Sequence, residues 1–199
     1  MRHVVPQEKY DTDYFVHNCD GFTVDGSLCR RLKTLLCHIQ LFSQKKADLL
    51  LLDVGCGRGE VAKYCRENNI SCVSTDYSHA AFELFRKNNP NEPFILHDLS
   101  KGFQWVAENY FDVVVMADIV EHLFPEHITQ TCSDMVRATK KGGIILIDTP
   151  IMDGGESELH VNIYSSAKEV HALFPGTDMV GTNWYKKPEH CNIILRKNG

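Results

Sequence analysis

Short apolar runs alternate with amphipathic stretches along most of this chain. Five of the runs are rich in Leu, Ile, Val or Phe, which is typical of strands that are buried on both faces of a sheet. They occupy residues 49–54, 72–76, 93–98, 111–118 and 143–149. The pattern therefore predicts five parallel strands.

Three amphipathic stretches separate these runs and predict crossover helices. Their apolar residues recur at spacings of three and four, and Asn or Lys stands near each C-terminal end. The stretches cover residues 60–69, 79–89 and 126–140. Regular alternation of strand and helix predicts an α/β, doubly wound sheet with right-handed crossovers, and such sheets bind ligands beyond the carboxyl ends of their strands.

The segments that flank this core also carry structural signals. Leucines and other apolar residues at helical spacing predict a helix within residues 26–45. After the core, the sequence predicts a short helix at 166–174 and strands at 177–182 and 190–196. We therefore divide the chain into an N-terminal arm with its helix, residues 1–45, and a core, residues 46–199.

Composition and charge narrow the class of protein. A length of 199 residues fits one domain, and a net charge of -5 argues against nonspecific attraction to nucleic acid. No apolar run reaches the roughly 18 residues of a membrane span, and the first residues lack the apolar core of a signal peptide. The eight cysteines are scattered without a CxxC pair. We therefore expect a cytoplasmic protein whose cysteines are buried thiols.

The stretch LLLLDVGCGRGEV, residues 49–61, carries three glycines at alternate positions. Gly55, Gly57 and Gly59 allow a sharp turn from strand to helix, and they let a ligand approach the backbone amides near the helix N-terminus. The third glycine stands one residue earlier than the GxGxxG pattern of dinucleotide-binding proteins requires. The loop by itself suits any nucleotide, so a nicotinamide-dependent oxidoreductase remains an alternative at this point.

Four successive predicted strands carry an aspartate at or near their carboxyl ends. Asp53 precedes Gly55 by two residues, where an unpaired carboxylate would repel a pyrophosphate. Asp76 stands where an acid can accept hydrogen bonds from ribose hydroxyls, and Asp98 could accept one from an adenine amino group. Asp118 ends the fourth strand. This row of acids favours a nucleotide with positive charge, and the sulfonium and ammonium of S-adenosylmethionine fit it.

The segments that carry these residues resemble the class I S-adenosylmethionine-dependent methyltransferases. They are LLDVGCGRGE, VSTDYS, ILHDL and FDVVVMADIVEHL, in that order, and the resemblance covers about residues 49–150. It implies a Rossmann-like, seven-stranded and mostly parallel sheet whose last, antiparallel strand would be HCNIILR. It also implies S-adenosylmethionine as the cofactor. Asp53 and Asp118 would be among the residues that bind it. In this set Gly55, Cys56 and Gly57 would line the methionine moiety, Asp76 the ribose, Tyr77 the adenine face, and Asp98 with Leu99 the adenine edge.

The N-terminal arm is rich in aromatic residues. Residues 10–22, YDTDYFVHNCDGF, are similar to a subset of these enzymes found in bacterial glycan and small-metabolite pathways. In many relatives an aromatic arm folds over the cofactor. Tyr10, Tyr14 and Phe15 therefore either form a lid or pack the arm onto the sheet.

Methyl transfer to a hydroxyl requires an aligned acceptor and a base that removes its proton. His122, in IVEHL, and His160, in ELHVNIYS, are the candidate bases, because imidazole exchanges protons near neutral pH. The alternative for His122 is that it only braces the loop after the fourth strand. The favoured function is metal-free O-methylation of a small metabolite or sugar. Its acceptor pocket would include residues 151–164, where Gly154 and Gly155 suggest a mobile loop.

Two other functions remain open at this level. Asp118, Glu121, His122 and His160 are similar to the metal-binding set of small-RNA methyltransferases that methylate the 2′-oxygen of a 3′-terminal ribose, where a metal would hold the vicinal hydroxyls. Asp118 replaces a glutamate of that set, and the acidic net charge also counts against nucleic acid. The third function is a cofactor-binding but catalytically idle partner subunit, which the intact glycine loop argues against.

Overall fold

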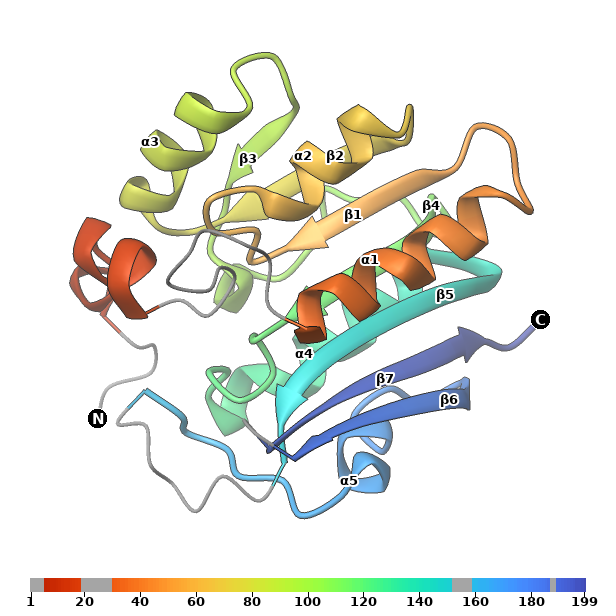
Figure 1. Cartoon of the computed structure of the whole chain (residues 1–199). Helices are drawn as coiled ribbons and strands as arrows, with labels where there is room; N and C mark the ends of the chain where they lie inside the picture. Colours follow the sequence, from red (N-terminus) through yellow and green to blue (C-terminus); the bar gives the residue numbers. More distant parts are fainter. Residues whose placement is uncertain (1–5, 19–29, 152–158, 187–188) are drawn as a thin grey trace. The chain divides into compact units, whose positions relative to one another are not determined.

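The computed structural model describes residues 6–18, 30–151, 159–186 and 189–199, which form two compact units (Figure 1). One unit comprises residues 6–98. The other contains the described residues from 99 onward. Part of the helix predicted at 26–45 and the glycines at 154 and 155 lie outside the described residues.

The first unit contains three parallel strands in the order β3-β2-β1. Because β1 and β2 run parallel, the chain must cross over between them, and helix α2 packs against β2 on this crossover. Tyr64 Oη of α2 donates a hydrogen bond of 2.7 Å to Gln40 Oε1 of α1, which ties the N-terminal helix to the layer. The elements are α1 (Arg30–Ser43), β1 (Leu50–Val54), α2 (Glu60–Glu67), β2 (Ser71–Asp76), α3 (His79–Asn88) and β3 (Phe94–Leu96).

The second unit contains four strands in the order β4-β5-β7-β6. Strands β4 and β5 are parallel, whereas β7 runs antiparallel to both β5 and β6. Helix α4 packs against β5, and α5 packs against β6 and β7 (Figure 1). The elements are β4 (Phe111–Ala117), α4 (Pro125–Ala138), β5 (Thr139–Pro150), α5 (Ala167–His171), β6 (Thr177–Lys186) and β7 (Glu189–Lys197).

Within the two units the strands follow the orders β3-β2-β1 and β4-β5-β7-β6, as expected for the predicted sheet with a single reversed strand, β7. The prediction of a doubly wound, mostly parallel α/β fold is therefore confirmed. Strand β5 begins four residues before the predicted 143, because Thr139 already pairs with Phe111 across a register shift. Strand β6 extends to Lys186 because it pairs with β7 along its length.

The connection from β3 to β4 contains a 3₁₀ turn at Leu99–Lys101 and further turns, but no α-helix within the described residues 97–110. Its backbone is held by α4 instead. Asp134 Oδ2 accepts a hydrogen bond of 3.1 Å from Phe103 N, and the Arg137 guanidinium donates to Phe103 O and Val106 O, each at 2.7 Å. Among the described helices, none has both the length and the apolar character needed to cross a bilayer.

Candidate functional site

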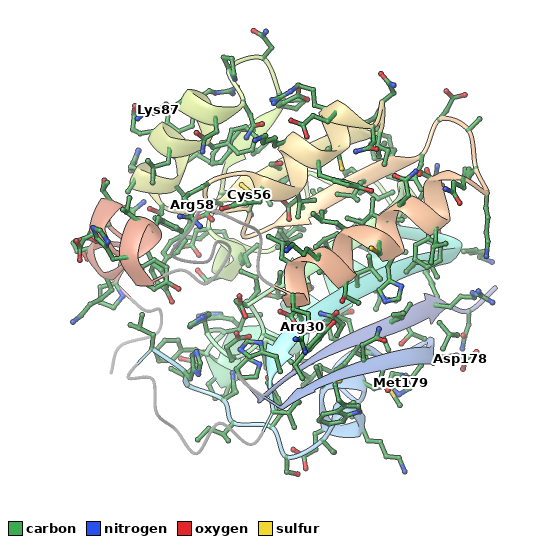
Figure 2. The ribbon with its side chains drawn as sticks, in the orientation of Figure 1. Arg30, Cys56, Arg58, Lys87, Asp178 and Met179 are labelled. Atoms are coloured by element: carbon green, nitrogen blue, oxygen red, sulfur yellow. The ribbon has the colours of Figure 1, made fainter. Side chains whose placement is uncertain are left out.

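The loop between β1 and α2 turns through three glycines with positive φ. These angles are 70° at Gly55, 50° at Gly57 and 84° at Gly59, a region that residues with a Cβ rarely adopt. Gly55 N and Cys56 N both donate to Thr75 O of β2, at 2.8 and 3.0 Å. Figure 2 shows Cys56 and Arg58 on this loop. The predicted strand-to-helix turn is therefore present, and it is anchored to the neighbouring strand.

Gly59 has a role that the sequence analysis missed, because it is a packing position against α3. A Cβ at Gly59 would lie 2.4 Å from Asn89 Nδ2 and 2.5 Å from Phe85 Cδ2. Asn89 Nδ2 also donates a hydrogen bond of 3.0 Å to Gly59 O. The third glycine thus allows the loop to approach the end of α3 closely.

Asp76, at the end of β2, holds the glycine loop by its carboxylate. Its Oδ2 accepts a hydrogen bond of 3.0 Å from Gly57 N, and its Oδ1 accepts one of 2.9 Å from Ser78 N. Burial raises the pKa of this carboxyl, and the backbone hydrogen bonds act in the opposite direction. A carboxylate has about four acceptor positions, so Asp76 can still accept a further hydrogen bond from a ligand hydroxyl.

Asp53, near the end of β1, is buried beside two further acids. Its side-chain atom Oδ2 has no hydrogen-bond partner among the described residues, and only 3% of the residue is exposed. Burial, with the charges of Glu60 and Asp76, raises the pKa of Asp53 to about 8. Arg58 Nε donates to Glu60 Oε1 at 2.8 Å, so part of the negative charge is balanced within the loop. This acidic surrounding with an unsatisfied carboxyl oxygen suits a positively charged nucleotide and disfavours a pyrophosphate.

The N-terminal arm packs against the same loop. Ser78 Oγ donates a hydrogen bond of 2.7 Å to Tyr10 O, and Gln7 Nε2 donates to Tyr77 O. Tyr10 and Phe15 are buried. A Cβ at Gly57 would lie 3.4 Å from the ring of Phe15, so this ring lies over the glycine loop. The arm therefore has the contacts that a lid needs, and its role as a lid stays a prediction.

Tyr77 lies between the arm and the end of β2. Its ring is 5.6 Å from that of Tyr10 in an edge-to-face arrangement. Burial raises the pKa of the Tyr77 phenol, and the charges of Asp76 and Asp98 add to this effect. Asp98 is half-buried and ends the first unit, while Leu99 opens the second. The structure thus brings Asp53, Gly55, Cys56, Gly57, Asp76 and Tyr77 together around the ends of β1 and β2.

The second unit brings Glu121, His122 and His160 together after β4. One ligand atom from each of the three side chains lies within 4.8 Å of the others. His122 Nδ1 is 3.0 Å from Leu159 O, a carbonyl that can only accept, so Nδ1 carries the proton. The lone pair of His122 is therefore on Nε2, which lies 3.9 Å from Glu121 Oε1.

The electrostatics of this cluster keep His122 uncharged. Burial lowers the pKa of His122 to about 4, and His160 adds to the effect, although the hydrogen bond to Leu159 and the charge of Asp118 oppose it. Burial and the charge of Asp118 raise the pKa of Glu121. Glu121 Oε2 accepts a hydrogen bond of 3.0 Å from Thr149 Oγ1. The arrangement can accept a proton at Nε2 of His122, or it can hold a cation between its nitrogen and oxygen atoms.

A second cluster in this unit contains two residues that the sequence analysis did not select. His190 Nδ1 lies 3.6 Å from Asp118 Oδ1 and 3.6 Å from Asp148 Oδ2. Asp148 lies in the predicted fifth strand near its carboxyl end, so the strand-end rule that selected the other acids could have found it. His190 is the second residue of the reversed strand β7, and no local sequence signal marks it.

Comparison with known proteins supports the assignment of the fold and cofactor. A model of the family described as "Methyltransferase domain" matches residues 52–147. No curated protein matches the chain in sequence. Many solved structures are similar to it, and three of them illustrate the range.

An S-adenosylmethionine-dependent methyltransferase from Archaeoglobus fulgidus has 17% identity and a TM-score of 0.67, covering 83% of this chain and 94% of its own. The 1,6-didemethyltoxoflavin-N1-methyltransferase of Burkholderia thailandensis, solved with S-adenosylhomocysteine, has 17% identity and a TM-score of 0.66, covering 85% and 78%. The [4+2]-cyclase SpnF has 14% identity and a TM-score of 0.75, covering 99% of both chains. At these identities the likenesses show the fold.

Proposed function

Because the chain belongs to the class I S-adenosylmethionine-dependent methyltransferases, we propose that it methylates a hydroxyl of a small metabolite or sugar. The observation that carries this proposal is the fixed tautomer of His122. Its Nδ1 donates to Leu159 O, so the basic lone pair is on Nε2, the atom that would accept a hydroxyl proton. A nitrogen acceptor with a lone pair would not need such a base.

The residues of the first unit fit S-adenosylmethionine, which supplies a methyl group already activated by the sulfonium. Asp53 Oδ2 is buried without a hydrogen-bond partner among the described residues, as expected of an atom that would interact with a cationic ligand. Asp76 would accept from the ribose hydroxyls, and Tyr77 with Asp98 would border the adenine. Gly55, Cys56 and Gly57 would line the methionine moiety.

The proposal can be tested by incubating the protein with S-adenosylmethionine and a panel of hydroxylated metabolites and sugars. Formation of S-adenosylhomocysteine together with an O-methylated product would support it. A product methylated only at nitrogen or carbon would overturn the choice of acceptor. The small-molecule part is supported by the similar 1,6-didemethyltoxoflavin-N1-methyltransferase, whose structure contains bound 1,6-didemethyltoxoflavin.

Replacement of Asp76 with alanine should weaken the binding of S-adenosylhomocysteine by about 1 to 3 kcal/mol, the cost of losing a charged hydrogen-bond partner. The variant loses the acceptor for the ribose and also the bond that holds Gly57 N. Calorimetric titration measures the dissociation constant. Asp178→Ala, which removes an exposed carboxylate on β6 (Figure 2), is the matched control and should bind normally. An unchanged dissociation constant for the Asp76 variant would refute the placement of the ribose.

The affinity for S-adenosylmethionine should rise with pH up to about 8 and then level off. In the free protein the pKa of Asp53 is raised to about 8, so binding of a cation beside it expels a proton. Release of one proton changes affinity by at most about tenfold per pH unit. Asp53→Asn should remove this dependence, and because the ligand's own titration is common to both proteins, their difference isolates Asp53. Parallel pH profiles would show that Asp53 does not face the cation.

Metal-dependent 2′-O-methylation of an RNA 3′ end is a second candidate function. The clustering of Glu121, His122 and His160 within 4.8 Å favours it, because these atoms could share a divalent ion. The net charge of -5 disfavours an RNA partner. Methyl transfer to an RNA duplex that disappears with a chelator would move this function ahead of the first, and chelator-resistant transfer to a small hydroxyl compound would dismiss it.

A further inference from the structure

We propose that Asp118, Asp148 and His190 form a binding site for a divalent transition-metal ion, separate from the cluster around His122 and independent of which acceptor is methylated. All three residues belong to the second unit. Their ligand atoms lie within 4.8 Å of one another.

The first supporting observation is the unsatisfied imidazole nitrogen of His190. The side chain is nine-tenths buried, and its Nδ1 has no hydrogen-bond partner among the described residues. A buried polar atom of this kind destabilises the fold unless a partner is supplied. Nδ1 faces two carboxylate oxygens at 3.6 Å each, so a cation between them would give the imidazole nitrogen a partner.

The distances fit an ion better than direct hydrogen bonds. An N–H···O bond to a carboxylate is about 2.7 to 3.2 Å long, well below the 3.6 Å seen here. Two ligands bound tetrahedrally to Zn²⁺ at about 2.0 to 2.1 Å stand roughly 3.4 Å apart. The distance of 3.6 Å between His190 Nδ1 and each carboxylate oxygen is close to this value.

A second layer of hydrogen bonds orients Asp148. Tyr185 Oη donates to Asn192 Oδ1 at 2.9 Å, and Asn192 Nδ2 donates to Asp148 Oδ1 at 2.7 Å. Asp148 Oδ2 is the atom that faces His190. Metal-binding carboxylates are commonly oriented by such outer hydrogen bonds.

The register of β7 brings these residues to one face of the sheet. Asp148 of β5 stands opposite Asn192, and Pro150 stands opposite His190. Side chains two residues apart on a strand point to the same face, so His190 and Asn192 both lie on the face of Asp148. Asp118 joins them at the end of β4, where its backbone N donates to Asp148 O at 2.8 Å.

The donor set and exposure indicate the kind of ion. One imidazole with two carboxylates suits Zn²⁺ or Mn²⁺, whereas Mg²⁺ and Ca²⁺ prefer oxygen ligands alone. The side chain of Asp118 is 31% exposed, so the site has an entry path from solvent. Three protein ligands with an accessible side are typical of zinc sites that keep a position open.

Calorimetric titration of the full chain with Zn²⁺ tests the proposal, and Co²⁺ provides a spectroscopic probe of imidazole coordination. We expect the wild-type protein to bind Zn²⁺, and we expect His190→Gln and Asp118→Asn each to weaken this binding at least about tenfold. Asn192→Ala removes the hydrogen bond that orients the Asp148 carboxylate. This variant should bind Zn²⁺ about 10- to 100-fold more weakly. Asp118→Asn is isosteric at a partly exposed side chain, so it keeps the test valid if the buried His190 variant unfolds.

His122→Gln is the matched control, because it removes an imidazole from the other cluster. Binding at the proposed site should persist in this variant and be weakened in the His190 and Asp118 variants. If the wild-type protein binds no Zn²⁺, or if all binding is lost with His122 and retained without His190, the proposal is wrong and the second cluster is an ordinary ion pair. Binding of two ions, one of which depends on His190, would support it.

Discussion

Replacement of His122 with alanine is expected to lower turnover about 100-fold or more, the usual contribution of a general base. The binding of S-adenosylhomocysteine should change little, because the proposed role of His122 is to accept the proton of the acceptor hydroxyl and not to hold the cofactor. The physical reason is the loss of Nε2, which the hydrogen bond from Nδ1 to Leu159 O keeps unprotonated. Steady-state kinetics with an identified hydroxyl acceptor and calorimetry with S-adenosylhomocysteine measure the two quantities.

The pH dependence of turnover gives a further test of the same role. A base must be unprotonated to act, and burial lowers the pKa of His122 to about 4. Turnover of the wild-type enzyme should therefore fall only as the pH drops through about 4, and this acid limb should be absent from the residual activity of the variant. His79→Ala, at an exposed position that begins α3, controls for the loss of an imidazole elsewhere. Near-normal turnover without His122 would show that this residue only stabilises the loop after β4. The same assay on His160→Ala would then decide whether His160 is the base.

Replacement of Gly59 with alanine is expected to reduce the free energy of unfolding by about 3 kcal/mol. One part is backbone strain, since a residue with a Cβ at φ 84° costs roughly 1 to 2 kcal/mol. The other part is overpacking, because the new methyl would meet Asn89 at 2.4 Å and the buried ring of Phe85 at 2.5 Å, at a cost of about 1 to 3 kcal/mol. Urea denaturation followed by circular dichroism measures the change.

Gly176→Ala separates the two parts of this cost. Gly176 has a φ of 80°, close to that of Gly59, but a Cβ there would have no heavy atom within 4 Å. The control variant should therefore lose only the strain energy, about 1 to 2 kcal/mol. Equal losses for the two variants would show that α3 moves aside and that close packing at Gly59 contributes little.

Much of the fold followed from local patterns. The apolar runs at 49–54, 72–76 and 111–118 became strands β1, β2 and β4 to within a residue, because strands that are buried on both faces require continuous apolar sequence. The glycine loop was likewise visible, since its positive φ angles demand glycine. The start of β5 was missed because it depends on pairing with Phe111, which the sequence around residue 139 does not reveal.

The candidate site was predictable only in part. Asp53 and Asp76 could be found because each stands at a strand end beside the glycine pattern, and His122 because it follows the fourth strand closely. The hydrogen bond from His122 to Leu159, which decides its tautomer, joins residues 37 positions apart and has no local signature. The packing of Gly59 against Phe85 and Asn89 is another contact between distant segments.

By itself, the sequence of this protein determined the strands, the crossover helices, the glycine loop and the row of acids, because each depends on residues that are close together in the chain. Only the tertiary structure decided which distant side chains meet. His190 reaches Asp118 and Asp148 because β7 returns antiparallel to β5 in a register that places Asn192 opposite Asp148. That register is set by hydrogen bonds and packing between strands that are far apart in the sequence, and a shift of one residue would turn His190 to the other face of the sheet.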